Sequence, residues 1–258
     1  MFEYIVMDSS EILITKYTGD EARVEVPGHI EGHAVTGIGD YAFSQTAITH
    51  LSLPESLRRL GRYALYQCHS LCELSFYGGL TDFGAGAFTG CHRIRQLNVD
   101  LGEDETSALR EVLMEVSEEL TLVYRCHGMT ALLMFPEYYE EGVENTPARI
   151  IEHHTHGSGL FYRNCFIHRK LQFPEYDKRF PYAIGQEKES FLLRLVTGRL
   201  RYPYSLTEEY RLVYESYLSE HFDKALDLFH RQQDTACIGF LMDFHHRRNK
   251  KSRPAFDL

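Results

Sequence analysis

The chain has 258 residues, of which 43% are hydrophobic and 25% are charged, a composition typical of a folded protein with a substantial core. Its formal net charge of −10 argues against a general nucleic-acid binder, because such a protein needs a basic face to neutralise phosphates. No apolar stretch reaches the length of a membrane-spanning helix, so we expect no membrane insertion.

The N-terminus carries neither a basic segment nor an apolar run of about 7–15 residues, so no secretory signal is visible. The sequence therefore predicts a cytoplasmic protein, or a cell-surface protein if a signal peptide has been removed. Six cysteines are irregularly spaced, at positions 68, 72, 91, 126, 165 and 237. This spacing favours reduced, buried thiols over a disulfide framework.

Residues 2–27 contain short runs in which apolar and polar side chains alternate, as is typical of β-strands. The runs 4–7 and 12–15 are followed by Gly19-Asp20 as a turn and then by a third run, 22–26. We expect strands and a hairpin here. They would form an N-terminal β cap on the repeats that follow.

Three copies of one pattern occupy residues 35–99, aligned on a glycine at positions 39, 61 and 84. In each copy the glycine is followed by three apolar residues with the constant spacing i, i+3, i+5. These triads are Ile48, Leu51 and Leu53; Leu71, Leu74 and Phe76; and Ile94, Leu97 and Val99. A strand with three inward apolar residues cannot bury them alone, whereas stacked coils align them in one core.

A period of about 22 residues with the pattern L-x-x-L-x-L is typical of a leucine-rich repeat solenoid. The glycine of each copy fits a position where the coil turns tightly. We therefore predict an α+β fold in two domains. Residues 1–104 form a short leucine-rich repeat solenoid with one β-strand per coil and the N-terminal cap, and residues 105–258 form a mainly α-helical domain.

The motif V-T-x-I-G-x-Y-A-F, followed by L-x-x-L-x-L-P, resembles the BspA-like (Treponema-type) bacterial leucine-rich repeat over about residues 10–100. Leu53-Pro54 matches the end of the motif, while Thr46 stands where the family has cysteine and Leu65 where it has phenylalanine. The resemblance implies a surface or secreted protein that is adhesive or binds proteins and has no catalytic residues. It does not extend to the helical half.

After Asp100 the apolar period changes to that of a helix with one buried stripe. The stripe comprises Leu109, Val112, Leu113 and Val116. A β-hairpin is expected at 120–135, which either continues the solenoid sheet or marks a junction between domains.

Helices are expected to dominate from Glu137 onward. Thr146-Pro147 predicts the start of a helix that Gly157-Ser158-Gly159 ends. Ser205 with Glu208 has the spacing of a capping box for a later helix. Further apolar stripes run through 191–196, 210–217, 222–229 and 237–244. The last two form an antiparallel pair joined at 232–233, with Asp234 as the cap of the second.

His153, His154 and His156 suggest an alternative function, a metal-dependent enzyme or metal-binding protein, because histidine is a common metal ligand. On the expected helix, however, only residues 153 and 156 share a face, and the pattern H-E-x-x-H is absent. Helix-terminal histidines that interact with the dipole are the simpler interpretation. Cys68 and Cys91 are similarly better explained by core packing than by zinc binding. We assign no catalytic, cofactor-binding or metal-binding residue.

Residues 160–182 interleave aromatic and basic side chains, which often anchor protein interfaces. The candidate binding residues are Phe161, Tyr162, Arg163, Tyr176, Arg179 and Tyr182. The alternative is that these aromatic residues fill an ordinary core. The sequence predicts a non-enzymatic protein–protein interaction module that needs no cofactor, with surface adhesion as an alternative implied by the resemblance.

Overall fold

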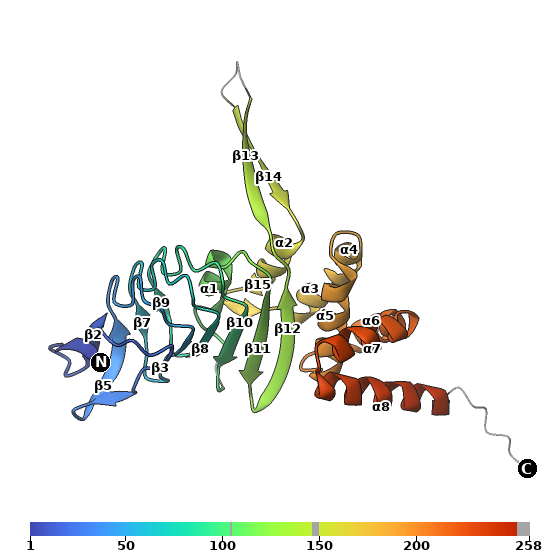
Figure 1. The fold of residues 1–258 in the computed structure, drawn as a ribbon, viewed down its shortest axis with the longest axis horizontal. Coiled ribbons are helices and arrows are strands. Elements are labelled where there is room, and N and C mark those ends of the chain that lie inside the picture. Colours follow the sequence, from blue (N-terminus) through green and yellow to red (C-terminus); the bar gives the residue numbers. More distant parts are fainter. Residues whose placement is uncertain (104, 146–149, 252–258) are drawn as a thin grey trace, which may run out of the picture.

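The computed structural model describes the backbone of residues 1–103, 105–145 and 150–251, and the side chains within these ranges except 143–145, 150–153 and 249–251. Two β-sheets form the walls of a solenoid that occupies one half of the elongated molecule, and helices occupy the other half (Figure 1). Within the described residues, no helix is both long enough and apolar enough to cross a membrane.

The first sheet consists of parallel strands with two antiparallel pairings, one at its edge and one to a short side strand. Its order is β1 (Phe2–Val6), β2 (Ile12–Tyr17), β5 (His33–Ile38), β7 (Arg59–Leu60) and β9 (Asp82–Phe83), with β4 (His29–Ile30) paired to β5. The second sheet is parallel except for its last pair. Its order is β3 (Arg23–Glu25), β6 (His50–Ser52), β8 (Glu73–Tyr77), β10 (Gln96–Asp100), β11 (Leu120–Cys126) and β12 (Met129–Phe135).

The predicted solenoid is confirmed by the register of the second sheet. Leu51 pairs with Leu74, and Leu74 pairs with Leu97, so equivalent residues of successive coils are direct neighbours. All three leucines are buried, with exposed fractions of 2% or less. The coil glycines have the expected role, since a Cβ built on Gly61 would lie only 2.5 Å from the backbone nitrogen of Asp40 in the preceding coil.

The N-terminal strands are present, but their connection differs from the expected hairpin at Gly19-Asp20. The antiparallel hairpin is formed by β1 and β2. Gly19-Asp20 lies at a corner of the coil instead, because β3 leaves the first sheet and pairs with β6 in the second. β1 is therefore the edge strand that covers the start of the first sheet.

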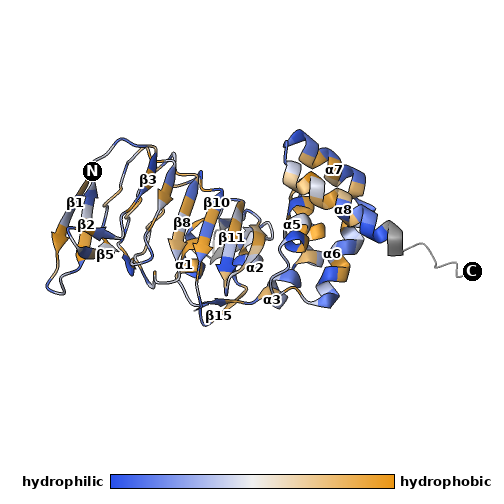
Figure 2. Cartoon of the chain, turned by 90° about the horizontal axis from the view of Figure 1, so that it is seen from below, coloured by the Kyte–Doolittle hydropathy of each residue, from blue (hydrophilic) through white to orange (hydrophobic). Residues whose placement is uncertain are grey.

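The expected helix after Asp100 is α1 (Leu109–Glu115), and Leu109, Val112 and Leu113 are buried. The hairpin at 120–135 continues the solenoid sheet, because β10 and β11 pair in parallel and β11 and β12 pair in antiparallel register. Figure 2 shows hydrophobic and hydrophilic residues alternating along β8 and β10 of the same sheet. The division into domains at residue 104 stays a prediction.

The helix expected between Thr146 and Gly157 is absent from its described part, and that prediction is wrong. Residues 150–156 form strand β14 (Ile150–His156), which pairs with β13 (Tyr139–Asn145) in an arm that projects from the body (Figure 1). Thr146-Pro147 lies outside the described residues. Gly157, at φ = +82°, ends this strand rather than a helix. Proline and glycine signals also mark turns, and here pairing with β13 decides the structure.

The remaining elements are mainly helical. They are α2 (Gly159–Arg163), β15 (Phe166–Ile167), β16 (Lys170–Leu171), α3 (Phe173–Asp177), α4 (Phe180–Ile184), α5 (Glu189–Arg201), α6 (Glu208–Glu220), α7 (Phe222–Arg231) and α8 (Thr235–Lys251). Helix α5 packs against β12, where a Cβ on Gly198 would lie 3.2 Å from the carbonyl oxygen of Leu132. The helices thus cover the last strand of the sheet.

Several helix predictions are confirmed, and one cap is corrected. The expected stripe of α5 is buried, and Asp234 caps α8 by accepting a 2.8 Å hydrogen bond from the N–H of Cys237. Helix α6 begins after Thr207, whose hydroxyl accepts a hydrogen bond from the N–H of Tyr210. Ser205 is not the cap because its φ is +51°, whereas a capping residue has an extended backbone.

Candidate functional site on the second sheet

The outer surface of the second sheet carries a row of polar side chains. Because side chains alternate along a strand, the residues between the buried apolar ones point outward. We call this surface the polar face and define it by His50, Ser52, Glu73, Ser75, Tyr77, Gln96, Asn98, Asp100 and Arg125.

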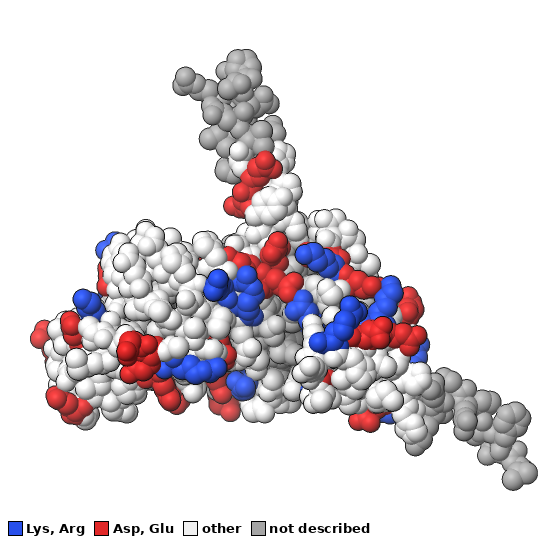
Figure 3. All heavy atoms as spheres, viewed as in Figure 1, with Lys and Arg blue, Asp and Glu red and all other residues white. Residues whose placement is uncertain are grey.

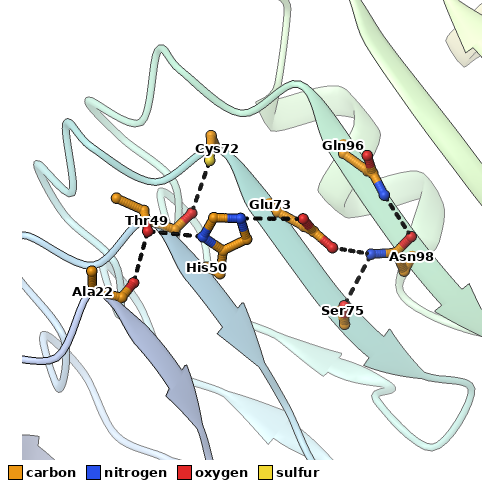
Figure 4. A network of polar contacts seen from close by, with 8 residues as sticks. All are labelled: Ala22, Thr49, His50, Cys72, Glu73, Ser75, Gln96 and Asn98. Carbon is orange, nitrogen blue, oxygen red and sulfur yellow. Dashed lines mark hydrogen bonds and ion pairs between the residues drawn. The ribbon is translucent and has the colours of Figure 1, made fainter. Parts of the chain in front are cut away.

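Hydrogen bonds connect the polar face across three strands (Figure 4). His50 Nε2 lies 3.4 Å from Glu73 Oε2, and Asn98 Nδ2 donates to Glu73 Oε1 at 2.7 Å. The same Asn98 amide donates to Ser75 Oγ at 3.1 Å, and Gln96 donates to Asn98 Oδ1 at 3.0 Å. These side chains are therefore pre-organised by hydrogen bonds to one another.

The edge of this network is fixed by the backbone of neighbouring coils. Thr49 Oγ1 donates to the carbonyl oxygen of Ala22 at 2.9 Å and lies 2.8 Å from His50 Nδ1. The Cys72 thiol donates to the carbonyl oxygen of Thr49 at 3.1 Å (Figure 4). The imidazole of His50 is thus held between a hydroxyl on one side and a carboxylate on the other.

A shallow groove of about 420 Å³ lies on the polar face. Its charged lining residues are Glu73, Asp100 and Arg125. Arg125 is exposed, and no described residue accepts a hydrogen bond from its guanidinium. The groove therefore offers a cation, carboxylates, hydroxyls and amides within one surface, which suits recognition of a polar ligand.

Acidic and basic side chains are interspersed on the face of the molecule shown in Figure 3, where no continuous basic surface is seen.

Three of the six candidate binding residues are completely buried, namely Tyr162, Arg163 and Tyr176. The Tyr176 hydroxyl donates to the carbonyl oxygen of Met134 at 2.6 Å, which joins α3 to β12. Arg163 donates to backbone carbonyl oxygens that include those of Leu113 and Val116, both at 3.0 Å. Burial lowers the pKa of Arg163 to about 10. These three side chains belong to the interior and are not available as surface anchors.

The other three candidates retain contact with solvent. Phe161 and Tyr182 are 42% and 49% exposed, and their rings meet edge to face with centroids 5.3 Å apart. Arg179 is half-buried and lies 3.8 Å from Glu175. The structure therefore brings two of the six candidates together as an exposed aromatic pair.

The histidine cluster lies on a strand rather than on a helix, so the shared face is that of residues 154 and 156. The His156 ring stacks on Tyr139 at 4.5 Å, and its Nε2 lies 3.2 Å from Glu141 Oε2. The side chain of His153 lies outside the described residues. The prediction that residues 153 and 156 share a face of a helix is therefore wrong.

The cysteines of successive coils have the expected packing role. The thiols of Cys68 and Cys91 are buried and donate to the carbonyl oxygens of Phe43 and Leu65, at 3.0 and 3.1 Å. The polar face was not among the binding residues predicted from the sequence. Its signal lies in the positions between the apolar residues of each triad, which strand alternation turns outward.

Comparison with known proteins identifies the repeat region. Residues 30–108 match the model of the BspA type leucine rich repeat region in six copies. None of the curated proteins compared with the chain matches it.

Three solved structures of bacterial proteins are similar to parts of the chain. A leucine rich cell surface protein of Faecalibacterium prausnitzii is 23% identical with a TM-score of 0.35, over 38% of this chain and 31% of that one. A T. pallidum leucine rich repeat protein is 19% identical with a TM-score of 0.29, over 50% and 79% of the two chains. A leucine-rich repeat protein from Bacteroides capillosus is 18% identical with a TM-score of 0.29, over 49% and 94%.

This chain spans about a third of the length of the F. prausnitzii protein. The family model leaves the helical half without a counterpart. Its match and the paired coils agree that residues 30–108 form leucine-rich repeats of the BspA type.

Proposed function

We propose that the protein is a non-enzymatic interaction module that binds a protein partner on the polar face of the second sheet. The observation that carries this proposal is the hydrogen-bonded network that spans β6, β8 and β10 beside the groove. Side chains that are already ordered lose little conformational entropy on binding, which favours affinity. Membership of a repeat family whose coils create extended surfaces supports the same function.

The chemistry of the groove indicates the kind of partner segment. Arg125 at one end favours a carboxylate of the partner, since arginine forms bidentate hydrogen bonds with carboxylates. Glu73, Ser75 and Asn98 in the middle offer both donors and acceptors. We infer that the partner contributes an extended polar segment with an acidic residue.

Affinity capture with matched variants tests this proposal. Asn98→Arg places a long side chain in the middle of the groove, whereas Thr15→Arg places the same side chain on the exposed side of β2 in the first sheet. We expect wild type and Thr15→Arg to retain a defined protein from a lysate of the native organism. Asn98→Arg should bind it at least about tenfold more weakly, because the longer side chain fills the groove and removes the amide that donates to Glu73 and Ser75.

Unfolding temperatures of all three proteins, measured beside the capture, confirm that each is folded. The proposal is wrong if nothing is retained above background, or if Asn98→Arg and Thr15→Arg bind equally well.

A second, smaller contact patch is proposed at the aromatic pair Phe161 and Tyr182. Both rings are exposed, although burying aromatic area is strongly favourable. Phe161→Ser should weaken binding of the captured partner without changing the polar face. Equal binding by this variant would remove the patch from the proposal.

A further inference from the structure

Three side chains of types that can bind metals converge where β11 turns into β12. Cys126 and His127 come from this turn, and Glu105 comes from the segment that follows β10. One thiol sulfur, one imidazole nitrogen and one carboxylate oxygen lie within 4.8 Å of one another. His127 Nε2 and Glu105 Oε1 are 3.5 Å apart. These residues belong neither to the polar face nor to the histidine cluster of the arm.

The turn itself fixes two of the three side chains. His127 and Gly128 have φ values of +51° and +69°, and they form a two-residue loop between the paired residues Cys126 and Met129. Two-residue loops with positive φ at both positions match the twist of a hairpin and are well defined. Cys126 is buried on the core side of β11, while His127 lies at the exposed end of the hairpin.

Hydrogen bonds tie the segment after β10 to this turn. The backbone N–H of His127 donates to the carbonyl oxygen of Gly102 at 2.8 Å. The Nδ1 atom of His127 lies 2.9 Å from Glu103 Oε2. A carboxylate on one ring nitrogen orients the imidazole and leaves the other nitrogen for a metal, as in many metal sites. Here that other nitrogen faces Glu105.

Glu105 is also held from the helical half of the chain. The Tyr204 hydroxyl donates to its Oε1 at 3.3 Å, and Lys170 Nζ lies 3.7 Å from its Oε2. The three ligands are therefore supported by hydrogen bonds and an ion pair from separate segments. Such support reduces the rearrangement that a bound ion would require.

We propose that Glu105, Cys126 and His127 bind one Zn²⁺ ion, with water as the fourth ligand. Zinc takes thiolate at about 2.3 Å and imidazole nitrogen or carboxylate oxygen at about 2.0–2.2 Å, in tetrahedral geometry. Ligand atoms in such a site are roughly 3.3–3.8 Å apart, so the present spacing needs only a small contraction. The thiolate excludes Mg²⁺ and Ca²⁺, which prefer oxygen ligands.

The ion would join the segment after β10 to the hairpin that carries the last strand of the sheet. It would therefore hold the end of the solenoid beside Tyr204, close to where the helices pack. Because a ligand that binds only the folded state stabilises it, saturating zinc should raise the unfolding temperature of the full chain.

Cobalt substitution tests the site directly. Full-length protein without a histidine tag is stripped with EDTA, dialysed, and titrated with Co²⁺ and then with Zn²⁺ as competitor. We expect one equivalent of Co²⁺ to bind with a thiolate-to-cobalt charge-transfer absorption that Zn²⁺ abolishes. Cys126→Ser should lose this absorption, while Cys72→Ser, which alters a more accessible thiol, should keep it.

Because Cys126→Ser could fail to fold, His127→Asn is tested as a second variant. The His127 side chain is 42% exposed, and asparagine tolerates the positive φ of this position. It should weaken Co²⁺ and Zn²⁺ binding at least about tenfold. The site is disproved if no charge-transfer absorption develops at one equivalent of Co²⁺, if Cys126→Ser or His127→Asn binds like wild type, or if Cys72→Ser removes the absorption instead.

Discussion

Gly61 lies where the backbones of two successive coils come closest. A Cβ at this position would meet the backbone of Asp40, and a Cβ at Gly84 would likewise meet the backbone of Arg62. Glycine therefore recurs in each coil because successive backbones come too close for a side chain. This recurrence explains why the solenoid could be predicted from one sequence. The buried positions of Tyr162 and Tyr176 could not be predicted in that way, since an aromatic residue without a clear period fits a core and a surface equally well.

Replacing this glycine should therefore destabilise the protein. We expect Gly61→Ala to lower the free energy of unfolding by about 1–3 kcal/mol, because backbone atoms cannot move aside as a flexible side chain would. Gly239→Ala in α8 is the matched control, where no described atom lies within 4 Å of the added Cβ. It should stabilise the protein by up to about 1 kcal/mol. Urea unfolding measures both changes, and equal midpoints for the two variants would contradict the close approach of the coils.

At the scale of elements, the helices are joined to one another by a buried ion pair. Arg199 of α5 donates to both carboxylate oxygens of Asp177 in α3, at 2.9 and 2.8 Å, and both side chains are fully buried. The hydroxyl of Tyr214 in α6 donates to the same carboxylate at 2.8 Å. One carboxylate thus connects three helices that local sequence signals could only predict separately.

Removing this charge should leave the arginine buried without its partner. We expect Asp177→Asn to lower the free energy of unfolding by about 3–5 kcal/mol. Glu208→Gln, which breaks the exposed pair with Arg211, should cost less than about 1 kcal/mol. Thermal unfolding followed by circular dichroism compares the two variants, and similar losses in both would show that burial does not strengthen the Asp177 interaction.

The arm shows where local signals fail at this scale. Thr146-Pro147 and Gly157 are typical of helix ends, yet residues 150–156 form a strand because each of them pairs across to β13. The polar face has a similar origin. Its outward residues follow from strand alternation, but the contacts of Asn98 with Glu73 and Ser75 depend on the register between coils that are more than 20 residues apart in sequence.

At the scale of the whole molecule, the second sheet runs without interruption from β3 to β12 and ends under α5. Arg163 reinforces this end, since it donates to carbonyl oxygens on α1, on the segment after it and on the segment after β12. The sequence pattern changes from repeat to helix at about residue 104, whereas the hydrogen-bonded sheet continues without a break through β11 and β12. We therefore propose that β11 and β12 unfold together with the solenoid.

Hydrogen exchange tests this cooperative unit. Amides of β11 should exchange at the same free energy as those of β8 and β10, and Leu74→Ala should lower all of them together by about 2–5 kcal/mol. Amides of the described strands β13 and β14 serve as an internal comparison, because an isolated two-stranded hairpin is only marginally stable. If β11 keeps its protection in Leu74→Ala while β8 and β10 lose theirs, the division at residue 104 is correct.

The uniform register of the coils has a consequence for the length of the molecule. Because Leu51, Leu74 and Leu97 occupy equivalent positions, a duplicated coil inserted between two existing ones would meet the same neighbours above and below. It would lengthen the rod by about 4.8 Å and widen the binding surface while both ends stayed as they are. Variants of this protein with different reach could therefore arise by in-frame duplication of a single repeat, without redesign of either terminus.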